Sequence, residues 1–344
     1  MNFSIGFSNH TWWPIMTSDT NTLGYWLNWR FLVCAIWVFA AMVVSALIVW
    51  RYEGSPKSRN QHREDRQEKI GTLHKDEVWK TCHKSIHPVC LLTYRILAFL
   101  VLLALLTADA VVHGGGIFYY YTQWTFTLVT IYFGLGSVLS IYGLKSRKEI
   151  SAERVNFVSS DAERGTYVAP ALGDNASAPC IPSSLNPQDE PPLLDAAGFW
   201  DYALQIIFQM CAGAVVLTDF VYWLIIYPFL TTNDYKLNFL VICMHSVNAV
   251  CLLGDVMLNR LRFPFFRIAY FILWTCVFVT FQWIIHMCVS LWWPYSFLDL
   301  SSQYAPLWYF GVGALHVPCY VIFALIIRMK KYFLSRFVQT PIEI

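Results

Sequence analysis

The chain has 344 residues, of which 57% are hydrophobic and only 13% are charged. Soluble domains carry about 25% charged residues, so this composition excludes an ordinary soluble protein and indicates a polytopic membrane protein. The formal net charge of +2 says little by itself, because the placement of Lys and Arg along the chain matters more. We expect a lipid bilayer as the main partner and no nucleic acid.

Seven apolar segments are each long enough to cross a bilayer as a helix. They predict an all-α bundle with transmembrane helices at 31–50, 89–112, 124–144, 205–227, 237–258, 268–291 and 307–327. The remaining segments are an outside N-terminal stretch at 1–30, a charged cytosolic loop at 51–88, a largely disordered cytosolic loop at 145–198 and a basic cytosolic tail at 328–344.

Lys and Arg residues alternate strongly between the segments that lie outside the spans. One set of alternate segments holds 21 of the 24 and the other set holds 2. The positive-inside rule therefore predicts an outside N-terminus and a cytosolic C-terminus. The localisation we expect is an integral membrane protein of the endoplasmic reticulum or the plasma membrane.

The span at 237–258 carries His245, Asn248 and Asp255 at spacings that place them on one stripe of a helix. Polar groups are costly in hydrocarbon, so this stripe should face the bundle interior or a cavity. Asp255 and Arg95 lie toward the cytosolic side at comparable depth. They predict an interhelical ion pair, with Arg260 or Arg262 as alternative partners of Asp255.

A second group of polar residues comes from different spans but falls in the outer half of the bilayer. It comprises Thr127, Asp219, His245, His286 and His316. A Thr hydroxyl becomes a nucleophile when a neighbouring imidazole takes its proton, and a second His or an Asp can orient that imidazole. One alternative is a non-enzymatic, receptor-like or scaffold membrane protein whose polar residues only hydrogen-bond between helices. The other is a metal-dependent membrane hydrolase that uses His and Asp ligands.

Three stretches resemble the androgen-induced and rolling-stone-like membrane proteins, the FAR-17a group. The first is QWTF, where the span at 124–144 begins, and the second is CMHSVNAVCLLGDV in the span at 237–258. The third, RIAYFILWTCVFVTFQWIIHMCVSLWWPYSFL, contains the span at 268–291. The resemblance covers about residues 89–330, and the long charged loops look like the plant branch of the group. Animal members are intramembrane threonine hydrolases of fatty acid esters of hydroxy fatty acids. No cofactor is expected.

The resemblance implies specific catalytic residues. The catalytic His falls on His245, preceded by Met244 as in the family. The family Thr stands four places after the Trp that opens its span, which is Leu128 here, whereas Thr127 stands three places after Trp124. We therefore predict Thr127 as nucleophile and His245 as base, supported by His286, His316, Asp219 and Asn248.

The predicted topology can be tested by glycosylation. The sequons at Asn9 and Asn175 fall on opposite sides of the membrane if the N-terminus is outside. Expression in a glycosylating cell should add a glycan at Asn9 and none at Asn175, as read from the gel shift of Asn→Gln variants. A glycan on Asn175 would invert the topology.

Overall fold

The computed structural model describes residues 19–53, 75–83, 85–163, 197–230 and 237–338. These residues form helices and connecting turns without a β-strand. Seven of the helical segments are long and apolar enough to cross a membrane, which confirms the predicted all-α, seven-span architecture. Both sequons and most of the two charged loops lie outside the described residues.

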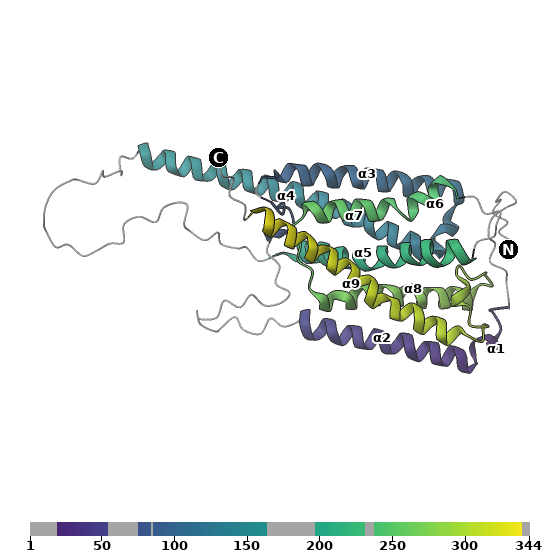
Figure 1. Cartoon of the computed structure of the whole chain (residues 1–344). Coiled ribbons are helices and arrows are strands. Elements are labelled where there is room, and N and C mark those ends of the chain that lie inside the picture. Colours follow the sequence, from purple (N-terminus) through teal and green to yellow (C-terminus); the bar gives the residue numbers. More distant parts are fainter. Residues whose placement is uncertain (1–18, 54–74, 84, 164–196, 231–236, 339–344) are drawn as a thin grey trace.

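The spans lie side by side as one bundle (Figure 1). A short helix, α1 (Leu23–Trp26), lies at one end, which we call the α1 end. The opposite end carries Arg51, Lys145 and Lys330, and we call it the basic end. The spans are α2 (Trp29–Glu53), α3 (Pro88–His113), α4 (Tyr121–Glu163), α5 (Phe199–Val221), α6 (Phe239–Met244) with α7 (Val247–Leu258), α8 (Ile268–Cys288) and α9 (Ala305–Val338).

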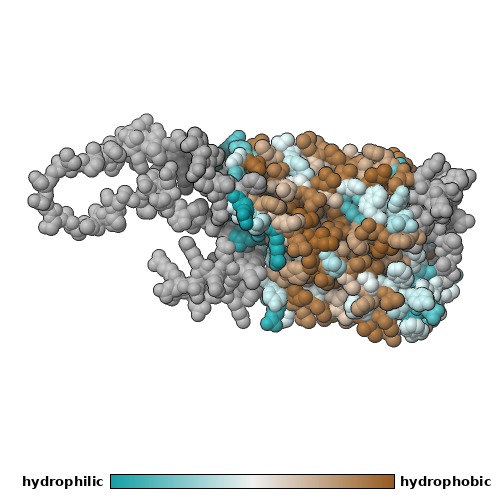
Figure 2. Space-filling model, in the orientation of Figure 1, coloured by the Kyte–Doolittle hydropathy of each residue, from teal (hydrophilic) through white to brown (hydrophobic). Residues whose placement is uncertain are grey.

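Hydrophobic side chains cover the flank of the bundle between its two ends (Figure 2). Many large apolar residues are exposed there, such as Phe39, Val111 and Phe229. A soluble protein rarely exposes so large an apolar surface, whereas lipid tails solvate it well. The seven spans and this surface make the chain an integral multi-pass membrane protein in contact with lipid.

Two helices extend beyond the predicted spans at the basic end. Helix α4 continues to Glu163, where the sequence predicts a loop from Lys145, and α9 continues to Val338. The α4 extension is rich in Lys, Arg and Glu, and the α9 extension is rich in Lys and Arg. These residues favour helix once the preceding turns have nucleated it. The segment at 164–196, also predicted to be disordered, lies outside the described residues.

The span that carries His245 is not one continuous helix. Helix α6 ends at Met244 and α7 begins at Val247, so His245 and Ser246 form a break. A break leaves backbone groups without their helical partners, and membrane proteins tolerate it only where other groups satisfy them. Here the indole Nε1 of Trp223 donates to the His245 carbonyl at 2.8 Å and thereby satisfies one of these backbone groups.

The Trp223 side chain comes from a second irregular segment. The residues after α5, Tyr222–Leu230, form a π-helix that contains Pro228. Proline lacks the N–H that an α-helix needs at that position, and π-helical turns are frequent at functional sites. The two irregular segments face each other near the α1 end.

The predicted ion pair between Arg95 and Asp255 is confirmed. Arg95 Nε donates to Asp255 Oδ1 at 2.8 Å, and both side chains are fully buried. The Arg95 Nη1 group also donates to the Val78 carbonyl at 2.8 Å and to Ser140 Oγ at 2.9 Å. The pair therefore joins α3, α4 and α7.

The second oxygen of Asp255 is satisfied as well. It accepts a hydrogen bond from the Tyr132 hydroxyl of α4 and another from Asn259 Nδ2 at 2.7 Å. A buried charge is tolerated when its partner and its remaining lone pairs are satisfied, and this carboxylate meets both conditions.

Removing one side of this pair should destabilise the bundle. We expect Asp255→Ala to lower the free energy of unfolding by about 3–5 kcal/mol, because Arg95 would remain buried without its partner. Reversible unfolding in mixed micelles measures it. The control is Lys145→Ala, which breaks a 4.0 Å pair with Glu149 whose side chains are 75% and 67% exposed. A loss for Asp255→Ala no larger than for this control would contradict the role of the pair.

Candidate functional site

A narrow cavity lies inside the bundle toward the α1 end. Its polar wall residues include Tyr121, Thr122, Thr218, His245 and Thr275, and its other walls are apolar. Its volume, counted as the space open to the centre of a water molecule, is about 70 Å³. A water site needs about 10–15 Å³ on this measure, so the cavity has room for several waters or part of an acyl chain.

His245 occupies the helix break and presents its ring to this cavity. The imidazole stacks on Tyr222, with ring centroids 3.7 Å apart and an angle of 5° between the planes. This contact fixes the plane of the ring but uses neither nitrogen. The His245 side chain keeps 10% of its surface accessible.

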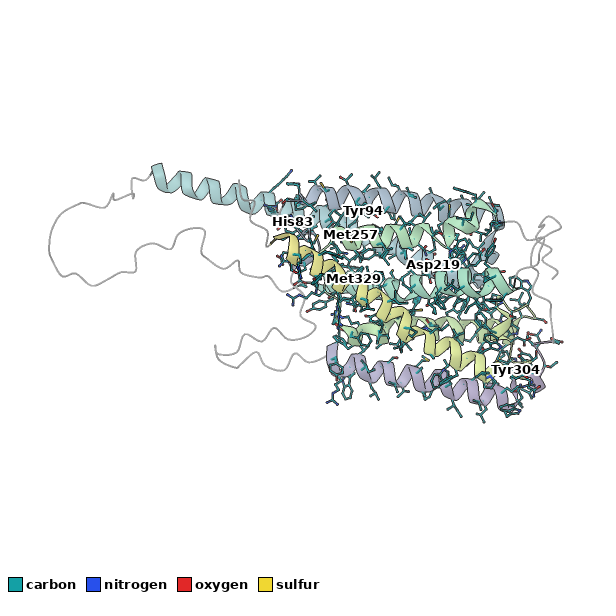
Figure 3. All side chains as sticks on the ribbon, in the orientation of Figure 1. His83, Tyr94, Asp219, Met257, Tyr304 and Met329 are labelled. Atoms are coloured by element: carbon teal, nitrogen blue, oxygen red, sulfur yellow. The ribbon has the colours of Figure 1, made fainter. Side chains whose placement is uncertain are left out.

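Asp219 lies beside His245 but does not hydrogen-bond to it. Its Oδ1 is 3.9 Å from His245 Nδ1, beyond hydrogen-bond range. Both atoms are buried and have no hydrogen-bond partner among the described residues. Figure 3 labels Asp219 in the half of the bundle nearer α1. An unpaired buried carboxylate oxygen facing an unpaired imidazole nitrogen is an unusual arrangement that calls for a functional explanation.

The level of Thr127 relative to His245 follows from the Tyr132–Asp255 hydrogen bond. Helices α4 and α7 run in the same direction, and Thr122 precedes Tyr132 by the same ten residues that separate His245 from Asp255. Thr122 is therefore level with His245, as their shared cavity shows. Thr127 lies five residues further along α4, or about 7.5 Å deeper.

The structure does not bring Thr127 and His245 into a hydrogen bond. The Thr127 hydroxyl is buried and has no partner in the described part of the chain, and Thr127 is not among the cavity wall residues. Asn248 lies a turn below His245 and is fully buried. Its amide nitrogen is likewise unpartnered within the described ranges.

His286 lies apart from this cavity, near the end of α8. Its Nδ1 is 2.7 Å from the Gln282 carbonyl and its Nε2 is 3.3 Å from the Trp292 carbonyl. The ring stacks on Trp293 with centroids 3.8 Å apart. Both nitrogens face backbone oxygens, so His286 holds the connection between α8 and α9 in place.

His316 does reach the cavity, through a threonine that the sequence did not single out. His316 Nε2 is 2.8 Å from Thr275 Oγ1, and Thr275 Oγ1 is 2.8 Å from the Tyr121 hydroxyl. Thr275 stands in an otherwise apolar run of α8, and its partner is 41 residues away. No local sequence signal marks such a pair, because it depends on how α8 and α9 are rotated.

The connection between α8 and α9 closes the cavity at the α1 end with Tyr295, Phe297 and Leu298. The Tyr25 hydroxyl of α1 holds this connection by donating to Asp299 Oδ1 at 2.7 Å. Burial raises the pKa of Tyr25, with a further contribution from Asp299, and burial also raises the pKa of Tyr295. Both phenols therefore stay protonated across the physiological pH range, so neither adds a charge to this wall.

The described residues offer no ligand set for a metal ion, since no three His, Cys, Asp or Glu side chains come together there. Comparisons with known proteins give no relative for this chain: no protein-family model, no curated protein and no solved structure matches it.

A bulky residue on the cavity wall should block ligand entry. Val312 of α9 lines the cavity, whereas Val317 on the same helix is 50% exposed on the outer surface. We expect Val312→Trp to weaken binding of a fluorescent long-chain fatty acid ester at least tenfold, measured by titration in nanodiscs, and Val317→Trp to leave binding unchanged. Equal binding by both variants would show that the cavity is not the binding site.

Proposed function

We propose that this protein is an intramembrane hydrolase of lipid esters, with Thr127 as nucleophile and His245 as general base. The observation that carries the proposal is the His245 ring: it lines a largely apolar cavity of the bundle, and its Nδ1 is buried without a hydrogen-bond partner among the described residues. A neutral imidazole in this condition can accept a proton from a hydroxyl.

Asp219 has the position of an orienting group. A carboxylate that accepts a hydrogen bond from one imidazole nitrogen fixes the tautomer and leaves the other nitrogen free as the base. The 3.9 Å gap between Asp219 Oδ1 and His245 Nδ1 must shorten by about 1 Å for this bond to form. Catalytic hydrogen bonds are often long without substrate and tighten when it binds.

The position of Thr127 adds a requirement to the proposal. The hydroxyl is buried and unpartnered within the described chain, so it is free to react. It lies deeper than His245, and substrate binding must therefore bring the two closer, or a water must carry the proton between them. The resemblance to the FAR-17a group supports His245 as the base, whereas its Thr position falls on Leu128, the neighbour of Thr127.

The cavity walls favour a neutral, apolar substrate. Apart from the His245 side chain, the walls offer hydroxyl groups and hydrocarbon. A fatty acid ester fits both, because its chains match the apolar walls and its carbonyl needs few donors. Such a substrate already dissolves in the bilayer that surrounds the helices.

The test is hydrolysis of fatty acid esters by the purified protein. Thr127→Ala and His245→Ala should each reduce turnover at least a hundredfold, since each removes a group that acts in the same step. The matched control is Thr130→Ala on the same helix, whose hydroxyl already donates to the Phe126 carbonyl at 2.9 Å. This variant should keep full turnover.

Folding of each variant is checked by its thermal unfolding midpoint. Full activity in both Thr127→Ala and His245→Ala would overturn the assignment. Absence of any ester hydrolysis by the folded wild type would favour the non-enzymatic alternative, in which the polar residues only join helices.

A further inference from the structure

Thr275 and His316 form a hydroxyl–imidazole pair on a wall of the cavity different from that of His245. Thr275 belongs to α8 and His316 to α9, and their Oγ1–Nε2 distance is 2.8 Å. Thr275 lines the cavity and is half-buried, whereas His316 is 3% exposed behind it. The hydroxyl thus faces the cavity, and the imidazole lies directly behind it, within reach of a proton from a group bound at Thr275.

The direction of each hydrogen bond follows from its partners. His316 Nδ1 is 3.0 Å from the Val312 carbonyl, which can only accept, so Nδ1 carries the proton. In the neutral ring Nε2 is then an acceptor, and Thr275 must donate its proton to it. The Thr275 oxygen in turn accepts from the Tyr121 hydroxyl at 2.8 Å.

This arrangement meets the geometric requirement for an activated hydroxyl. A nucleophilic hydroxyl needs a base within about 2.6–3.2 Å, and the base needs a third group that fixes its tautomer. Thr275, His316 and the Val312 carbonyl supply these three parts. Thr275 also has a longer alternative acceptor, the Phe271 carbonyl at 3.3 Å, but the imidazole is the closer one.

We propose that Thr275, which lines the cavity, is a second acyl-accepting hydroxyl of this protein, with His316 as its base. Thr275 Oγ1 attacks the carbonyl carbon of an ester, and its proton passes to His316 Nε2. The ester C–O bond breaks, and the leaving alcohol takes that proton. Water then cleaves the acyl-threonine at less than a hundredth of the rate at which the Thr127 pair turns over, giving one proton to His316 and releasing the fatty acid, and His316 returns the proton to Thr275.

Tyr121 is placed to assist this step. Its hydroxyl donates to the Thr275 oxygen in the resting state, so it is the donor closest to the reacting centre among the partners of Thr275. When Thr275 Oγ1 becomes an ester oxygen, it is a weaker acceptor, and the same donor can turn to the negative carbonyl oxygen. A preorganised donor of this kind stabilises the charge that develops.

The inference rests on the proposed function only for its substrate class, because the reacting residues differ. The test is labelling of the full-length protein in detergent with a long-chain fluorophosphonate, followed by mass mapping of the modified residue. We expect the adduct on Thr275. It should be lost in Thr275→Val, retained in Thr275→Ser, and reduced at least tenfold in His316→Gln.

The matched control is Thr280→Val, since Thr280 also lies on α8 but donates to the Cys276 carbonyl at 2.8 Å. This variant should label as the wild type does. The Thr275→Val variant removes the hydroxyl while keeping the side-chain shape, so its unfolding midpoint separates lost chemistry from lost folding.

The two proposals fail separately. Labelling of Thr275 that persists in a Thr127→Ala/His245→Ala double variant supports this inference whatever the fate of the first pair. Labelling on Thr127 alone overturns it and leaves the proposed function standing. Folded wild type that shows neither labelling nor ester hydrolysis overturns both.

Discussion

The buried ion pair between Arg95 and Asp255 fixes the register of the bundle. Both side chains are fully buried, so each charge depends on the other for its neutralisation. Helices α3, α4 and α7 must therefore stay where the guanidinium and the carboxylate meet. The Tyr132 hydroxyl adds the same constraint from α4. Ten residues toward the α1 end, this register places His245 level with Thr122 at the cavity. The position of the candidate site is thus set by an interaction about 15 Å away from it.

The carboxylates of Asp255 and Asp219 differ in how their oxygens are satisfied. Around Asp255, the carboxylate oxygens have short partners on every side. Toward the α1 end, several buried polar atoms have none among the described residues, including atoms of Asp219, His245 and Asn248. Native proteins rarely leave buried polar groups unpaired without a reason, and a site that receives water and an ester group is one such reason. The Arg95–Asp255 pair provides stability, and the unpartnered groups near His245 belong to the candidate site.

The sequence predicted the spans and the Arg95–Asp255 pair because both depend on composition and depth. A charge in hydrocarbon needs a partner, and few residues at that level can serve. The break at His245 was not predicted, since Leu237–Leu258 is apolar and of span length, and only the facing Trp223 explains how the break is tolerated. Thr275 was missed because its role depends on the rotation of α8 against α9. The same limit applies to Thr127, whose level relative to His245 emerges only from the helix register.

In the function we propose, an ester dissolved in the membrane meets an activated hydroxyl at the cavity beside His245. The most direct measurement is the release of fatty acid from a fatty acid ester by purified wild-type protein in nanodiscs, made in water enriched in heavy oxygen. The account predicts release in proportion to the protein present, with one heavy oxygen in each new carboxylate. Release no faster than from protein-free nanodiscs would contradict it.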